Sequence, residues 1–147
     1  MDSNIVSFEE RARIRNENMR KKIKDGIDIQ EVRRYYYNTV EVSIRHLPLL
    51  QRYLVEEYLA EIIYEFFFQG VAASKLYKAG RTAEEIERSY SQQHLLSIYT
   101  LANDFNLMSR LGEWDFYSVS IIAEDLAAKW FRHGLVYGKK QRKLRLL

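Results

Sequence analysis

Residues 49–78 decide the fold. They read LLQRYLVEEYLAEIIYEFFFQGVAASKLYK and follow Pro48, which is a favourable residue in the first turn of a helix. Apolar side chains recur along this stretch at helical spacing, so we predict one long central helix over 49–78. The members of this apolar stripe are Leu50, Leu54, Leu59, Ile62, Ile63, Phe66 and Phe67.

The length of this helix constrains its surroundings. A straight helix over 49–78 would be about 45 Å long, whereas a compact domain of this size is about 38 Å across. The helix therefore bends, contacts another helix closely, or extends into a dimer. We favour a bend or a close contact at Gly70, because small residues follow it. Gly134 and Gly138 form a G-x-x-x-G spacing, which indicates close packing or a fraying helix end.

Two helical segments are predicted before the central helix. Residues 7–25 begin with a capping box of Ser7 and Glu10. We interpret this helix within 1–25 as a solvated surface helix; the alternatives are that it is only loosely docked or that a partner orders it. Segment 29–47 follows an N-cap at Asp28, with Glu31 as the second residue of its box. The apolar period favours a helix there, although the β-branched and aromatic residues also suit a strand.

Two more helical segments follow the central helix. One begins at a capping box of Thr82 and Glu85, and its pattern weakens into a predicted loop over 103–112. The last begins near Asp115 and runs into a basic C-terminal tail, 139–147. We therefore predict an all-α, single-domain bundle of about five helices over residues 1–147.

Composition excludes several classes of protein. The 147 residues contain no cysteine, which excludes a disulfide framework and thiolate zinc sites, and one proline and six glycines argue against a β-sandwich. His46, His94 and His133 lack the spacing of a helical metal site, and no glycine-rich phosphate loop occurs. We therefore predict no catalytic, cofactor-binding or metal-ligating residues, no cofactor, and no enzymatic activity.

Charge is uneven along the chain. Residues 1–25 carry seven basic and five acidic groups, and residues 26–138 carry eleven basic and fifteen acidic groups. The basic patch consists of Lys139, Lys140, Arg142, Lys143 and Arg145. Such a cluster either stays solvated and offsets a helix dipole, or contacts nucleic acid or an acidic partner.

The carboxylates of Glu57, Glu61 and Glu65 recur every four residues and so share one helix face. They are either solvated or paired at the surface, or they line an acidic groove. Apolar side chains cover most sides of the central helix, so either it lies at the centre of the domain or oligomerisation covers one face. The candidate interface residues are Tyr35, Tyr36, Tyr37, Tyr64 and Phe68.

The opening Ile5-Val-Ser-Phe-Glu-Glu-Arg, followed by a basic helix, resembles short uncharacterised proteins of Bacillus-type bacteria. This resemblance implies a cytoplasmic protein and indicates nothing about its activity. The first 25 residues lack the apolar core of a signal peptide, and Glu61 and Glu65 interrupt the most apolar stretch, so we predict no membrane contact.

The predicted function is that of a non-enzymatic bacterial protein of the cytoplasm that acts through homo-oligomeric or protein–protein contacts. The alternative is a nucleic-acid-associated regulator that uses the basic N- and C-terminal segments. Nucleic acid is the less favoured partner, because no helix-turn-helix signature is evident.

Overall fold

The computed structural model describes residues 17, 20, 21 and 24–147. The capping box predicted at Ser7 and Glu10 lies outside the described residues, as does the opening segment that carries the resemblance. Within the described part the chain is helical and contains no strand, which confirms the all-α class. The elements are α2 (Ile29–Tyr35), the π-helix η1 (Tyr36–Val40), α3 (Glu41–Ile44), α4 (Leu49–Ala73), the 3-10 helix η2 (Ser74–Ala79), α5 (Ala83–Asp104), α6 (Leu107–Leu111) and α7 (Glu113–Lys143).

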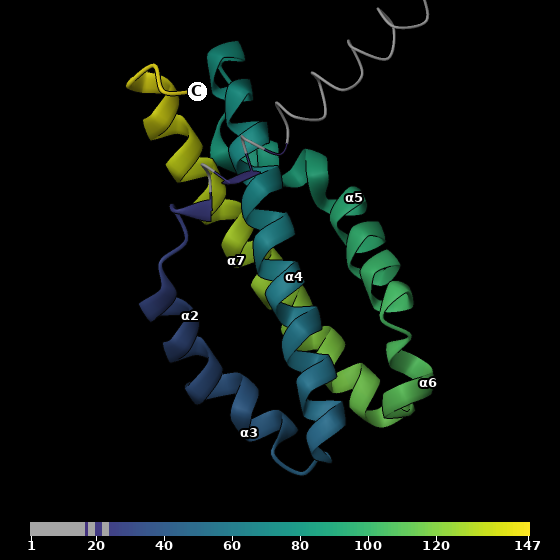
Figure 1. The fold of residues 1–147 in the computed structure, drawn as a ribbon. Coiled ribbons are helices and arrows are strands. Elements are labelled where there is room, and N and C mark those ends of the chain that lie inside the picture. The colour runs from purple at the N-terminus through teal and green to yellow at the C-terminus, as the bar shows by residue number, and fades with distance from the viewer. Residues whose placement is uncertain (1–16, 18–19, 22–23) are drawn as a thin grey trace, which may run out of the picture.

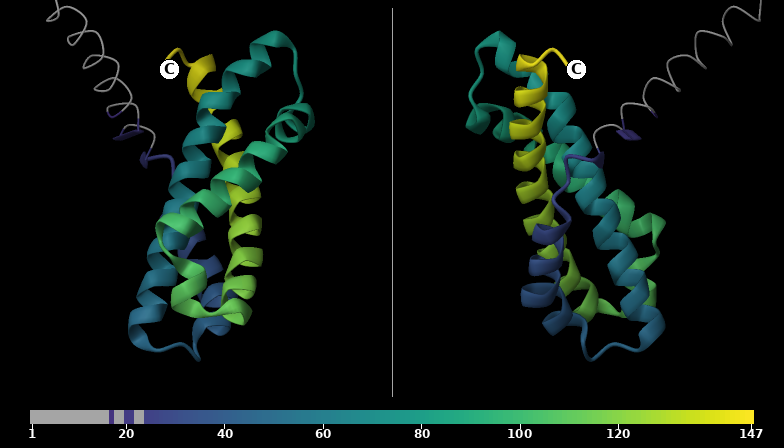
Figure 2. Two further views of the ribbon diagram at one scale, coloured as in Figure 1. Left: turned by 90° about the vertical axis from the view of Figure 1, so that its right-hand side faces the viewer. Right: turned by 60° about the vertical axis from the view of Figure 1, so that its left-hand side comes forward.

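The two long helices α4 and α7 form the centre of the bundle. They run side by side in the same direction, while α2–α3 and α5 run the opposite way on either side of them (Figures 1 and 2). The predicted central helix is therefore confirmed: Phe66 and Phe67 of α4 pack with Trp130 and Phe131 of α7 in the core. None of the described helices is long and apolar enough to cross a membrane.

Glycines bring the backbones of α4 and α7 into contact. A Cβ built on Gly70 would overlap the carbonyl oxygen of Phe131, and one on Gly134 would overlap that of Phe67. Gly138 lies in the same way against Ser74. The close contact predicted at Gly70 is confirmed, and the G-x-x-x-G spacing marks close packing rather than a fraying end.

Segment 29–47 is helical, so the strand alternative is wrong. The Asp28 carboxylate accepts from the backbone N–H of Gln30 at 3.0 Å and begins α2 as predicted. The predicted box partner Glu31 instead faces α7, where His133 and Lys129 offer it positively charged or hydrogen-bonding partners. The π-helix then carries the chain into α3 without a break.

The other predicted boundaries need two corrections. The capping hydroxyl of Thr82 accepts from the backbone N–H of Glu85 at 3.2 Å, as predicted. Residues 103–112 are not simply a loop, because α6 forms where Leu107 and Leu111 can bury their side chains. Helix α7 begins at Glu113 and continues to Lys143, so that most of the predicted basic tail is helical.

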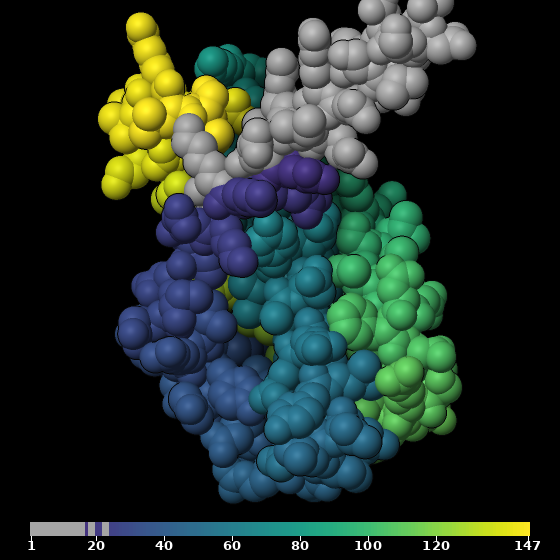
Figure 3. Space-filling model, viewed as in Figure 1, coloured from purple at the N-terminus to yellow at the C-terminus, as the bar shows by residue number. Residues whose placement is uncertain are grey.

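The acidic row of α4 lies mostly on the surface. Glu57 and Glu61 are exposed on the outward face of α4, which remains visible between α2–α3 and α5 (Figure 3). Glu65 is instead paired with Arg20 at 3.1 Å. The row is therefore solvated at two positions and neutralised within the chain at the third.

Candidate functional site on the outer face of α7

Helix α7 has an inner face against α4 and an outer face toward solvent. The outer face carries large apolar side chains that remain exposed: Trp114 at 82%, Ile121 at 51% and Val136 at 62%. Between them lie the exposed Asp125, Ala128 and Arg132. Exposed apolar side chains that follow one helix face are typical of an interaction surface. We call these six residues the outer stripe.

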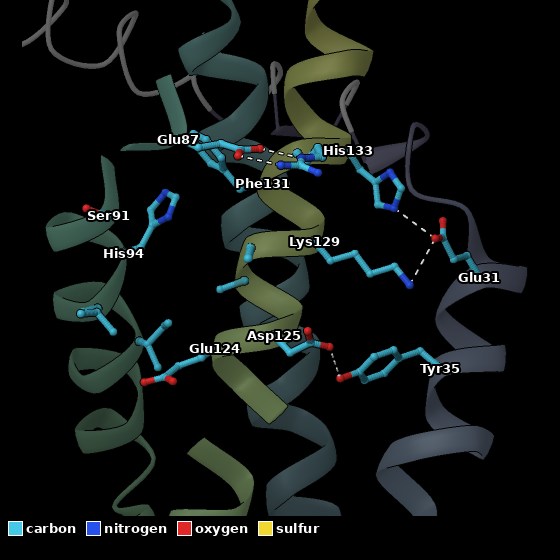
Figure 4. A pocket seen from close by; sticks show the side chains of 15 residues that line it. Glu31, Tyr35, Glu87, Ser91, His94, Glu124, Asp125, Lys129, Phe131 and His133 are labelled. Carbon is cyan, nitrogen blue, oxygen red and sulfur yellow. Dashed lines mark hydrogen bonds and ion pairs between the residues drawn. The ribbon is translucent and has the colours of Figure 1, made fainter. Parts of the chain in front are cut away.

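A groove of about 830 Å³ lies over the middle of the outer stripe, where Asp125, Ala128 and Arg132 line it. Figure 4 shows α7 in the middle of this region, with α5 on one side and α2 on the other. Tyr35 and Glu31 reach it from α2, and His94 and Leu95 reach it from α5. Side chains of both neighbouring helices therefore border the outer face of α7.

The contacts on the α2 side are hydrogen bonds and ion pairs. The Tyr35 hydroxyl donates to Oδ2 of Asp125 at 2.7 Å, and burial together with this bond raises the pKa of Tyr35. Oε1 of Glu31 lies 3.0 Å from Nε2 of His133 and 3.4 Å from Nζ of Lys129 (Figure 4). These bonds leave Oδ1 of Asp125 without a hydrogen bond to a described residue.

The contact on the α5 side is a two-point ion pair. Arg132 donates from Nε and Nη2 to the two oxygens of Glu87 at 2.7 and 2.8 Å, which lowers the pKa of that carboxyl. Such forked pairs fix the guanidinium in one plane. Since Nε and Nη2 are used, Nη1 of Arg132 remains for an acceptor outside the chain.

His94 behaves as an aromatic ring of the core rather than as a base. Its ring centroid lies 4.4 Å from that of Phe131 and 4.9 Å from that of Phe66. Burial lowers the pKa of His94 to about 4, so the imidazole is neutral at pH 7. Its Nε2 has no hydrogen-bond partner among the described residues, which is consistent with a packing role.

The five predicted interface residues are used in separate contacts within the chain. Tyr35 faces Asp125, and the Tyr36 hydroxyl donates to Glu56, which raises the pKa of Tyr36 to about 12. Tyr37 is 63% exposed and meets the Tyr36 ring edge to face.

The remaining two candidates contact the N-terminal part of the chain. The Tyr64 hydroxyl donates to the carbonyl oxygen of Arg20 at 3.4 Å, and the Arg20 guanidinium lies 4.0 Å from the centre of the Phe68 ring. Phe68 is half-buried and also packs against the hydrophobic core. The structure thus does not gather the five residues into one surface, and only Tyr35 reaches the groove beside α7.

No metal site emerges in the described part of the chain, where no group of three or more His, Asp or Glu side chains could hold an ion. The remaining histidine pair, Nε2 of His46 with Asp115 at 2.7 Å, joins the end of α3 to the start of α7. The polar side chains near α7 therefore act as links between helices.

The sequence-based predictions missed the outer stripe because its residues alternate with the core residues of the same helix. One signal was available in the sequence: four of the six stripe residues lie symmetrically about the midpoint between Ala128 and Lys129. Asp125 and Arg132 lie equally far from that midpoint, and so do Ile121 and Val136.

Comparisons with known proteins give no indication of function, so the function is argued from the residues of this chain. No protein-family model, no curated protein and no solved structure matches this sequence.

Proposed function

We propose that this chain is a non-enzymatic helical protein that acts as a homodimer, in which the outer stripes of two α7 helices pack antiparallel. The observation that carries the proposal is the mirrored order of the stripe. When two copies of one helix pack antiparallel about a two-fold axis, each position meets the position equally far beyond the axis. With the axis between Ala128 and Lys129, Asp125 of one copy then meets Arg132 of the other and Ile121 meets Val136, whereas Trp114 meets Lys143.

Opposite charges meet on each side of the axis. Asp125 of one copy faces Arg132 of the other, and this pair forms twice. Both side chains keep an unused polar atom after their bonds within the chain, Oδ1 of Asp125 and Nη1 of Arg132. The contacts with Tyr35 and Glu87 hold the two groups in place, so less side-chain entropy is lost when they pair across the interface.

Apolar contacts extend the interface away from the axis. Ile121 of one copy faces Val136 of the other, and each side chain is about half exposed in the single chain. Covering the exposed part of such a side chain is worth about 1 kcal/mol. At the axis, the methyl group of Ala128 is small enough for two helices to approach closely.

The test uses charges placed at paired positions. Ile121→Glu and Val136→Lys should each weaken the dimer at least about tenfold, because each change puts an unpaired charge into an apolar contact. The double variant should recover dimerisation, because the introduced carboxylate of one copy then faces the introduced ammonium group of the other. Sedimentation equilibrium or light scattering over a concentration series measures the dissociation constants.

Leu96→Glu is the matched control, because Leu96 is 69% exposed on α5 and lies outside the stripe. This variant should dimerise like the unaltered chain. Three results would contradict the proposal: a strict monomer at about 50 µM, equal loss in the Leu96→Glu control, or no recovery in the double variant.

A further inference from the structure

One end of the bundle collects basic residues from two distant parts of the sequence. The 3-10 helix η2 and the last turns of α7 lie together at this end (Figure 2). We call its seven exposed cations the basic pole: Lys75, Lys78, Arg81, Lys139, Lys140, Lys143 and Arg145. The first three are absent from the basic patch expected from the sequence, because a single chain segment does not contain both groups.

Contacts between the two segments hold the pole together. Nε of Arg142 donates to Oγ of Ser74 at 2.7 Å, and its Nη2 lies 3.4 Å from the carbonyl oxygen of Val71. Nζ of Lys139 lies 4.5 Å from the centre of the Tyr77 ring. The two groups of cations therefore belong to one packed unit.

Contacts within the chain account for Arg142 and, through the Tyr77 ring, for part of the role of Lys139. Arg142 is half-buried and binds a carbonyl in the last turn of α4, where a cation offsets the negative end of the helix dipole. None of the seven pole residues forms an ion pair with another residue of the described chain. Seven unpaired cations at one end repel one another, and they remain available to an anionic partner.

The fold also separates charge along the molecule. Residues 71–82 and 134–147 contain eight Lys and Arg and no Asp or Glu. Residues 28–70 and 83–133 contain eight Lys and Arg and fifteen Asp and Glu. The first two segments therefore carry +8 and the other two −7. Such an arrangement attracts a polyanion to the pole and repels it from the other surfaces.

We infer that the basic pole binds the phosphate backbone of duplex nucleic acid without reading its sequence. Lysine and arginine side chains that are exposed and unpaired contact phosphates and release counterions on binding. The single-strand alternative is disfavoured, because single strands need aromatic rings on which bases stack, and the nearby Tyr77 ring lies beneath Lys139.

An anionic bilayer is the less favoured partner. Surfaces that dock on bilayers add aromatic and apolar side chains that insert between headgroups. The large apolar side chains exposed at the tip of the pole are two leucines, Leu144 and Leu146. The exposed Trp114 lies in the first turn of α7, at the opposite end of that helix, and so cannot insert together with them.

The test measures binding of the full chain to a fluorescent duplex of roughly 30 base pairs across 50 to 200 mM salt. Affinity should fall steeply with salt, with a logarithmic slope of about −4 to −6 for five to seven phosphate contacts. The triple variant Lys75→Glu, Lys78→Glu, Arg81→Glu should bind at least about tenfold more weakly and lower the magnitude of the slope by about 2 to 3.

The matched control is Arg33→Glu, Arg34→Glu, Arg45→Glu, which changes net charge equally at exposed positions outside the pole. The inference is overturned if both triple variants weaken binding equally, since net charge alone would then explain it. It is also overturned if the unaltered chain does not bind the duplex at 50 mM salt, or if it binds phosphatidylserine vesicles more tightly than the duplex.

Two features keep the test decisive. If circular dichroism shows that the charge-reversed pole variant is unfolded, the neutral variant with glutamine at positions 75, 78 and 81 replaces it, and an unchanged affinity in that variant overturns the inference. None of these three positions lies on α7, so the test does not depend on dimerisation through the outer stripe.

Discussion

The two tryptophans of the chain lie on opposite faces of one helix and have opposite surroundings. Trp130 on the inner face of α7 is 2% exposed and packs against Phe67 of α4, whereas Trp114 in the first turn is 82% exposed. Residue type therefore does not decide burial here. What differs is the partner: the inner face packs against α4 along its length, whereas Trp114 on the outer face stays 82% exposed.

The largest effect is expected from the inner tryptophan. Trp130→Ala should lower the free energy of unfolding by about 3–5 kcal/mol, because a large buried side chain is lost and a cavity remains. Trp114→Ala is the matched control and should change the stability of the monomer by less than about 0.5 kcal/mol. Urea unfolding, carried out at protein concentrations low enough for the chain to be monomeric, measures both free energies of unfolding. Similar losses at the two positions would contradict the difference between the faces.

A smaller effect is expected where the inner face meets α4 at a glycine. Gly134→Ala should destabilise the fold by about 2–3 kcal/mol, because the new Cβ overlaps the carbonyl oxygen of Phe67 and the two helices must move apart. In an open helix the same change would stabilise by about 1 kcal/mol, so the sign of the effect separates the two cases. Thermal unfolding followed by circular dichroism measures it, and a stabilised variant would argue against the close contact.

The smallest effect is a pH dependence of stability, and it arises from His94 of α5, whose ring packs against Phe131 of α7. The folded-state pKa of His94 is about 4, below its unfolded value of about 6.5, so the unfolded chain takes up the proton first as pH falls. The stability from the neutral ring is fully present above about pH 6.5 and is lost toward pH 4. The partly hydrated ring should contribute about 1–2 kcal/mol.

His94→Phe should remove this part of the pH dependence, because phenylalanine fills the same ring contacts and cannot be protonated. Urea unfolding at pH 7, 5.5 and 4.5 compares the two chains. His133→Gln provides a control, since His133 is half exposed beside Glu31 and its ring contacts Trp130 rather than the Phe66 and Phe131 rings that surround His94. An unchanged pH dependence in the His94→Phe variant would assign the effect to other groups.

The predictions that are confirmed rest on signals of short range along the chain. Capping by Thr82 and the start of α4 after Pro48 depend on neighbours within four residues, and both are confirmed. The failed partner assignment of Glu31 has the opposite origin. A capping box and an ion pair across helices compete for the same carboxylate, and His133, far along the chain, decided the outcome.

The candidate sites show the same division more sharply. The sequence predicts an interface at Tyr35, Tyr36 and Tyr37, because three consecutive residues on a helix cannot all face one core. That reasoning is sound locally, yet it cannot tell which neighbour meets each ring. The hydroxyl of Tyr35 donates a hydrogen bond to Asp125 and that of Tyr36 donates to Glu56, so two of the three tyrosines have hydrogen-bond partners within the chain.

By itself, the sequence determined where helices begin, which faces are apolar and that Gly70 and Gly134 permit close approach, because these properties depend on spacing along one helix. Only the tertiary structure decided that α4 and α7 run in the same direction, that η2 joins the end of α7, and that Lys75 and Lys143 belong to one basic pole. The physical reason is distance along the chain: no local pattern records the charge of a neighbour about seventy residues away, and packing alone brings the two together.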